Sequence, residues 1–336
     1  MKTRVLAVVL ALALLPAPPQ VLAAATDARA AEPHLLIVGG LGGEDYYSEL
    51  FHRWVETLAE IGSRRLGLSH DHLIRLEDAP PPLQDSATAP SRKENVLGAI
   101  HRLARRSAPG DVVAIVLLGH GAARGDRAQF NLPGPDLSAA ELDHALGELK
   151  GRTVAVVVAA PASAPFIDRL SGPDRIVIAA TSSASENQHT RFGGHFVDAL
   201  AGDAADTDKD GRVSLLEAFD FATREVARSF ETDGTVRTEH ALLDDNGDRA
   251  GSRDPGTEGG DGYLAARTYL AAPAHGSGTT AGARALALDI EARRLVDRIE
   301  ALKRDKRTLE SDDYFARLEG LLVELAMNRR AYRRLE

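Results

Sequence analysis

The chain has 336 residues, of which 44% are hydrophobic and 26% are charged, and its formal net charge is −9. This apolar fraction suffices for a substantial core, and the acidic balance argues against a nucleic-acid partner. The sequence contains no cysteine, which excludes disulfides, a lipid-bearing cysteine and thiolate chemistry.

The first 25 residues have the pattern of a cleaved secretory signal. Lys2 and Arg4 precede the apolar run 5–15, and small residues that suit a signal peptidase follow at 23–25. The run is too short to span a membrane comfortably, and no later apolar segment is long enough. We therefore expect an exported protein, periplasmic or extracellular, with no transmembrane segment in the mature chain.

Between residues 33 and 270, apolar runs alternate with amphipathic helical patterns. Continuous Val, Ile and Leu runs predict buried strands at 35–38, 73–76, 112–118, 153–160 and 175–180. Helical spacing predicts helices at 44–61, 91–107, 138–149, 191–201 and 215–230. Capping boxes, Ser91 with Glu94 and Ser138 with Glu141, mark two of the helix starts, and the proline-rich stretch 77–91 is expected to be a loop. This order predicts an α/β fold with an open, mostly parallel sheet between two layers of helices.

Residues 206–217, DTDKDGRVSLLE, place oxygen donors where a helix-loop-helix calcium loop of the EF-hand type needs them. The six ligand positions are held by Asp206, Asp208, Asp210, Arg212 through its carbonyl, Ser214 and Glu217. Gly211 falls where the loop must turn sharply. Ser214 and Glu217 also form a capping box, which explains the second half of the motif but not the alternating aspartates. We therefore predict a Ca²⁺ site that clamps the two flanking helices.

A second acidic cluster offers alternate donors at Asp244, Asn246 and Asp248. Arg249 replaces the turn glycine, and Pro255 stands where a closing glutamate should be. A reverse turn on Asn246-Gly247 is the simpler interpretation. Because water or a distant carboxylate can complete an oxygen cluster, metal binding here stays open.

His120 stands between two glycines directly after the strand predicted at 112–118. This strand-Gly-His-Gly pattern, the two apolar strands that follow, and Thr181-Ser182-Ser183 with Glu186 resemble the legumain-like branch of the caspase-legumain clan of cysteine peptidases over residues 33–200. The resemblance implies a caspase-like three-layer fold in which His120 matches the general base. It also implies that Pro161 occupies the place of the nucleophilic cysteine.

Without a cysteine, the resemblance implies an inactive peptidase-like domain that binds a peptide or protein, or acts as a scaffold. The alternative is a hydrolase in which Ser163 and His120 replace the Cys-His dyad. Ser163 lacks the glycines of a nucleophile elbow, and no acid is evident to orient the histidine. The inactive, binding function is therefore favoured.

Residues 271–283 are rich in Gly, Ala, Ser and Thr and are expected to be a flexible linker. Beyond them, two apolar series at helical spacing predict an antiparallel helical hairpin over 284–336. The first series is Leu288, Leu295, Ile299 and Leu302, and the second is Phe315, Leu318, Leu322 and Leu325. The hairpin either pairs with itself or docks on the core, or it serves as an arm that forms a homo-oligomer.

Overall fold

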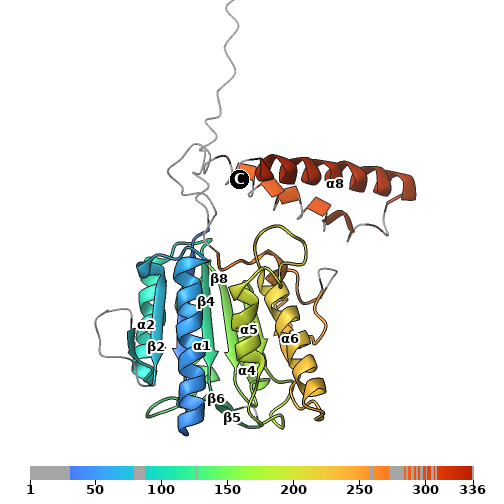
Figure 1. Cartoon of the computed structure of the whole chain (residues 1–336). Coiled ribbons are helices and arrows are strands. Elements are labelled where there is room, and N and C mark those ends of the chain that lie inside the picture. Colours follow the sequence, from blue (N-terminus) through green and yellow to red (C-terminus); the bar gives the residue numbers. More distant parts are fainter. Residues whose placement is uncertain are drawn as a thin grey trace, which may run out of the picture.

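The computed structural model describes residues 31–78, 88–125, 127–256 and 260–271, and within 284–334 all residues except 285–286, 289–290, 293, 296–297, 300, 304–305 and 307–308. An α/β core and a carboxyl-terminal pair of helices are visible (Figure 1). The predicted signal peptide, 1–25, lies outside the described residues, as does all of the predicted linker except residue 271.

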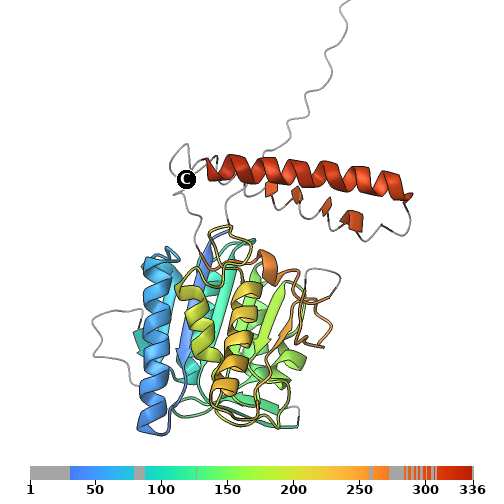
Figure 2. The same ribbon diagram turned by 45° about the vertical axis from the view of Figure 1, so that its right-hand side comes forward.

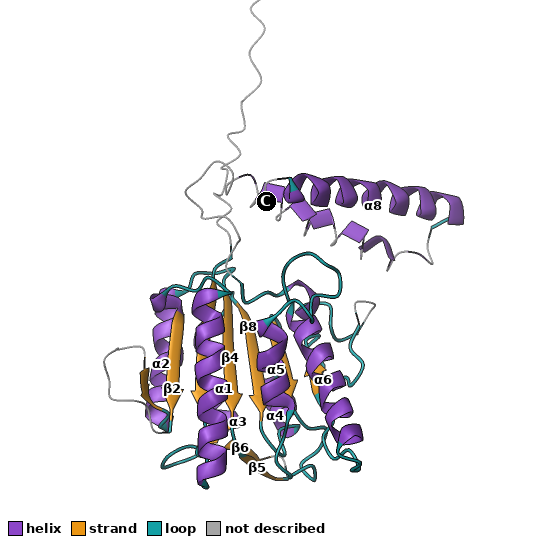
Figure 3. Cartoon of the chain, viewed as in Figure 1, coloured by secondary structure: helices purple, strands orange, loops and turns teal. Residues whose placement is uncertain are grey.

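A seven-stranded sheet with the order β10-β9-β8-β4-β1-β2-β3 forms the middle of the core (Figure 3). Its strands are β1 (Pro33–Gly39), β2 (Leu73–Glu77), β3 (Thr88–Pro90), β4 (Val112–Leu118), β8 (Thr153–Ala159), β9 (Arg175–Ala179) and β10 (Leu242–Asp244). All neighbours pair in parallel except β10, which runs antiparallel to β9. The central strands are buried along almost their whole length, as their unbroken apolar runs require. The predicted mostly parallel sheet is confirmed.

Helices cover both faces of the sheet (Figures 1 and 2). One face packs against α1 (Asp45–Arg64), α5 (Phe192–Ala201) and α6 (Leu215–Thr232). The other face packs against α2 (Lys93–Arg106), α3 (Ala139–Leu146) and α4 (Pro165–Leu170). Short 3₁₀ turns lie at His70–His72, Gly147–Leu149 and Ala265–Arg267. The arrangement is a three-layer α/β fold.

Two local predictions within the core were wrong. The stretch 77–91 contains a strand, β3, that pairs with β2, and this pairing is a long-range effect invisible in a proline-rich sequence. The helix α2 begins at Lys93 without a side-chain cap, and Ser91 is buried instead of capping it. The capping box of Ser138 and Glu141 at the start of α3 is confirmed.

A small antiparallel sheet follows β4 and was not predicted. It consists of β5 (Gly121–Arg124), β6 (Arg127–Phe130) and β7 (Leu137–Ser138). The three strands are only two to four residues long, and although β6 alternates exposed and buried residues, so short a pattern was not recognised as a strand. The sheet places the chain after His120 beside the end of the main sheet (Figure 3).

The carboxyl-terminal helix α8 (Ser311–Arg333) packs against helical residues of the segment 284–303. The buried side of α8 carries Tyr314, Leu318, Leu321 and Leu325, so the predicted face was wrong for Phe315 and Leu322, which are exposed. The error arose because α8 is apolar on two sides. Within the described part of the chain, no helix has both the length and the apolarity of a membrane span.

Candidate metal centre

The acidic loop 206–217 connects α5 to α6 and lies near the amino ends of the parallel strands. Just before the loop, Asp203 accepts a hydrogen bond of 2.5 Å from Arg65, which follows the end of α1. The helix α1 begins near the carboxyl end of β1 and runs back along the sheet, so its last residues lie near the amino ends of the strands. The contact with Arg65 therefore places the loop at the amino ends of the parallel strands. His120 follows β4 and lies at their carboxyl ends. In Figure 1, β5, which directly follows His120, lies at the other end of the strands from the connection between α5 and α6.

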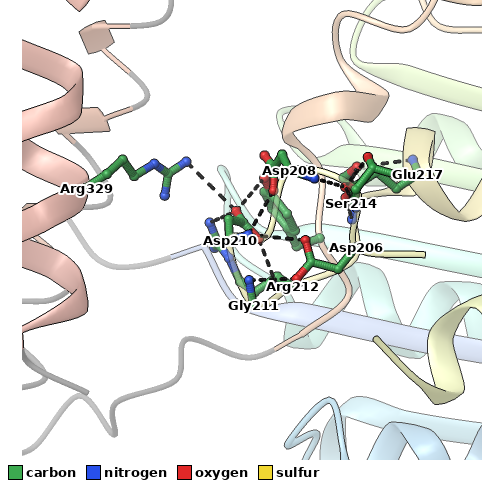
Figure 4. Close-up of polar contacts among 10 residues, drawn as sticks. Asp206, Asp208, Asp210, Gly211, Arg212, Ser214, Glu217 and Arg329 are labelled. Carbon is green, nitrogen blue, oxygen red and sulfur yellow. Dashed lines mark hydrogen bonds and ion pairs between the residues drawn. The ribbon is translucent and has the colours of Figure 1, made fainter. Parts of the chain in front are cut away.

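Three aspartates of the loop converge (Figure 4). Asp206, Asp208 and Asp210 place carboxylate oxygens within 4.8 Å of one another. The backbone holds them there: the Asp210 N–H donates to Asp206 at 3.2 Å and to Asp208 at 3.0 Å, and the Gly211 N–H donates to Asp206 at 3.0 Å. Gly211 has φ of +85°, the left-handed conformation that glycine adopts without strain. The three carboxylates converge, and the cluster could hold a metal ion.

Glu217 does not join this cluster. One carboxylate oxygen accepts hydrogen bonds from the Thr207 N–H at 2.8 Å and the Thr207 hydroxyl at 2.9 Å. The other accepts from the Ser214 N–H and hydroxyl, both at 2.9 Å, in the predicted capping box. Burial acts to raise the pKa of Glu217, but these hydrogen bonds outweigh it and lower the pKa below its ordinary value. Glu217 thus ties the two arms of the loop together as an ionised group.

The charge of the cluster is partly balanced by cations. The Arg212 guanidinium and the Tyr269 hydroxyl each donate to one Asp210 oxygen at 3.2 Å, and Arg329 of α8 lies 3.9 Å from the same oxygen (Figure 4). Asp208 has less compensation, since burial and the neighbouring carboxylates raise its pKa above the ordinary value. A bound cation would relieve that repulsion.

The second acidic cluster forms with a partner that sequence reasoning missed. Asp244, Asp248 and Asp261 place carboxylate oxygens within 4.8 Å of one another. Asp244 is fully buried and accepts a hydrogen bond from the Ser171 hydroxyl at 2.9 Å. Burial, together with nearby acidic residues, raises the pKa of Asp261 to about 6. Asn246 instead hydrogen-bonds Asp248. An Asp-Gly pair at 261–262 was the only sequence signal for the third carboxylate.

One segment, 261–269, connects the two clusters. It begins at Asp261 and ends at Tyr269, which bonds Asp210 and forms an antiparallel bridge with Ser214. The Leu215 N–H, at the start of α6, donates to the Thr268 carbonyl at 2.9 Å. Both acidic clusters therefore fasten the same strip of chain.

His120 lies at the carboxyl end of β4 among aromatic rings. Its ring centroid lies 4.7 Å from that of Tyr47, 5.0 Å from that of Phe51 and 6.1 Å from that of His189. Burial lowers the pKa of His120, although a hydrogen bond to the Gly42 backbone opposes the shift. Burial and the neighbouring His120 also lower the pKa of His189 to about 4. Both imidazoles are therefore neutral at neutral pH.

Pro161 lies beside the His120 loop, because a Cβ placed on Gly121 would be 3.0 Å from the Pro161 carbonyl oxygen. Ser163 has no exposed surface, and its hydroxyl lies 3.1 Å from that of Thr181, whose N–H donates to it at 3.1 Å. The described residues show no hydrogen bond between Ser163 and His120. The structure thus places Pro161 beside Gly121, the residue after His120, but ties Ser163 to the neighbouring strand end.

No family model matches this chain, and no curated protein matches it in sequence.

Proposed function

We propose that the chain is an exported calcium-binding protein in which the loop 206–217 clamps α5 to α6. The observation that carries the proposal is the convergence of Asp206, Asp208 and Asp210 within 4.8 Å, around a loop turned by Gly211 at φ +85°. Ca²⁺ takes six to eight oxygen ligands in flexible geometry. The three aspartates, the Arg212 carbonyl, Ser214 and Glu217 would supply them, with Glu217 exchanging its hydrogen bonds to Thr207 for the ion.

A structural clamp fits the position of the loop better than a catalytic role. The loop lies at the amino ends of the parallel strands and His120 at their carboxyl ends. An ion in the loop therefore cannot act on a group bound beside His120. A calcium sensor commonly opens paired loops to expose an apolar groove. Here the loop is bridged instead to Tyr269 of a connecting segment. Calcium would therefore hold the helix pair and that segment in place.

Calorimetry tests the proposal. Titration of the mature chain with Ca²⁺ should give a binding heat that Asp206→Ala abolishes and Glu217→Gln weakens. Calcium at about 100 times its Kd should stabilise the protein by about 2.7 kcal/mol, a rise in Tm of about 4 °C. Asp203→Asn is the matched control, since it removes an exposed aspartate just outside the loop.

The control should bind as the unaltered protein does. If Asp203→Asn and Asp206→Ala weaken calcium binding equally, the binding depends on the negative charge of the region and not on the ligand positions of the loop. Heat that persists unchanged in Asp206→Ala would move the site to Asp244, Asp248 and Asp261. Neither heat nor a Tm shift would end the proposal.

We further propose that the core is a legumain-like, caspase-like domain without peptidase activity that binds a peptide or protein at its strand ends. The proposal is supported by the position of Pro161 beside Gly121, the residue after His120, and by the aromatic surroundings of the histidine. The fully buried Ser163 does not favour the alternative hydrolase, because a nucleophile must reach its substrate.

A serine-directed fluorophosphonate probe and a peptide library distinguish these functions. We expect no labelling of Ser163 and no peptide cleavage by the folded, calcium-loaded protein. Labelling of Ser163 that disappears in His120→Ala would establish the hydrolase instead. The calcium proposal does not depend on either result.

A further inference from the structure

The helix α8 carries two apolar stripes on opposite sides. The covered stripe, with Tyr314, Leu318, Leu321 and Leu325, packs on Leu295, Ile299 and Leu302 of the preceding helical segment. Its members recur at alternating steps of four and three residues, the spacing of a helix packed along one seam. Within the hairpin this stripe has its partner.

The second stripe is exposed. Its large side chains are Phe315 (56% exposed), Leu322 (49%), Val323 (51%) and Met327 (68%). Exposed alanines at 316 and 326 lie among them. Of the large hydrophobic side chains exposed among the described residues, most belong to this one stripe, although α8 is a short part of the chain. Glu319 is also exposed and lies within the stripe, with Phe315 on one side of it along α8 and Leu322, Val323 and Met327 on the other. Exposed apolar side chains gathered in this way on one helix indicate an interaction site.

The charges at the two ends of the stripe have opposite sign. Asp312 opens it and Arg330 closes it, and both are exposed. They are 18 residues apart, which is five full turns of an α-helix, so they lie on one line along α8. A second α8 in the same direction would place like charges side by side, whereas one in the opposite direction would place each acidic end against a basic end.

We propose that two copies of this chain associate through the exposed stripe of α8, with the two helices antiparallel and Asp312 of each copy opposite Arg330 of the other. This register places Phe315 level with Met327 of the second copy but on the other side of the contact line, so that Phe315 packs beside Ala326 of the second copy. It also places Ala316 opposite Ala326 of the second copy, which lets the helices approach closely. The stripe is therefore complementary to itself, as an interface with two-fold symmetry requires.

Sedimentation equilibrium of the mature, full-length chain tests the association. We expect a dimer. Combining Phe315→Glu and Met327→Glu should raise its dissociation constant at least tenfold and leave the helical content, measured by circular dichroism, unchanged. Val236→Glu is the matched control, because Val236 is a hydrophobic residue on the surface of the α/β domain, outside α8, and is 84% exposed. It should leave the dimer intact.

Charge exchange tests the direction of the helices. Asp312→Arg and Arg330→Asp should each weaken the dimer, and their combination in one chain should restore it. Helices in the parallel direction would show no such restoration, because each residue would face its own copy.

Cross-linking tests the register, because the chain has no native cysteine. A mixture of Glu319→Cys with Val323→Cys should form a disulfide, because the two positions lie opposite each other close to the contact line. Phe315→Cys should not form a disulfide with itself, since the two copies would be about 18 Å apart along the axis at a rise of 1.5 Å per residue.

Three results would overturn the proposal. The first is a monomer at all concentrations. The second is self-cross-linking of Phe315→Cys, which would show parallel helices. The third is a monomer that binds lipid vesicles and loses that binding with Phe315→Glu and Met327→Glu, which would assign the stripe to a membrane surface.

Discussion

Replacing Phe219 by alanine is expected to lower the free energy of unfolding by about 3–5 kcal/mol, the range for truncating a buried phenylalanine. Phe219 is fully buried in α6, and its ring centroid lies 6.1 Å from that of Phe192 in α5. The truncation therefore leaves a cavity at the contact between the two helices that flank the acidic loop. Urea or guanidinium unfolding, compared at equal m-value, measures the loss.

Phe221→Ala is the control on the same helix. Phe221 is only partly buried at the edge of the same core, so its truncation should cost about 1 kcal/mol, an ordinary value for a point substitution. Because α5 and α6 position the loop, Phe219→Ala should also weaken calcium binding, whereas Phe221→Ala should not. Equal losses of stability in both variants would show that the α5–α6 contact is not a dominant part of the core.

The parallel sheet could be predicted because its central strands are apolar on every residue. Val112–Leu118 matches its predicted bounds, and Thr153–Ala159 differs from them by one residue. Such runs need cover on both faces, which only a three-layer arrangement supplies. The strands β3 and β10 were missed because each is three residues long and is defined by its neighbour in the sheet.

The candidate metal centre also contains residues whose positions follow from local sequence and residues whose positions depend on tertiary folding. Asp206, Asp208, Asp210 and Gly211 act within a single turn of chain, so their spacing alone predicts their convergence. Glu217 has competing partners, and the donors of Thr207 and Ser214 hold it. Asp261 reaches its cluster through tertiary folding, which spacing along the chain cannot reveal. The buried face of α8 was mistaken because two apolar stripes give the same period.

Glu239→Gln is expected to remove a fall in stability between about pH 4.5 and pH 7. Glu239 is 3% exposed, and its carboxylate accepts hydrogen bonds from the Arg191 N–H at 2.8 Å and the Phe192 N–H at 2.9 Å, at the start of α5. Burial raises the pKa of Glu239 to about 7 in spite of these donors. The folded protein therefore holds a proton that the unfolded chain releases near its ordinary pKa.

The sign of the effect follows from this difference in bound protons. Below about pH 4.5 both states are protonated, and the carboxyl group carries no penalty. As the pH rises to about 7, the folded state binds more protons than the unfolded state, so stability falls by up to about 3 kcal/mol. Glutamine has no such titration, although it loses one backbone hydrogen bond at every pH, at a cost of about 1 kcal/mol.

The measurement is the difference in unfolding free energy between Glu239→Gln and the unaltered protein across this pH range. Taking the difference removes the shared titrations of other buried groups, such as Asp220 and Asp261. We expect the free energy of unfolding of Glu239→Gln to rise relative to that of the unaltered protein as the pH rises. Glu49→Gln, which removes an exposed carboxylate from α1, controls for the loss of one charge. Parallel profiles for Glu239→Gln and the unaltered protein would mean that the α5 donors hold Glu239 ionised, and that their attraction outweighs the cost of its burial.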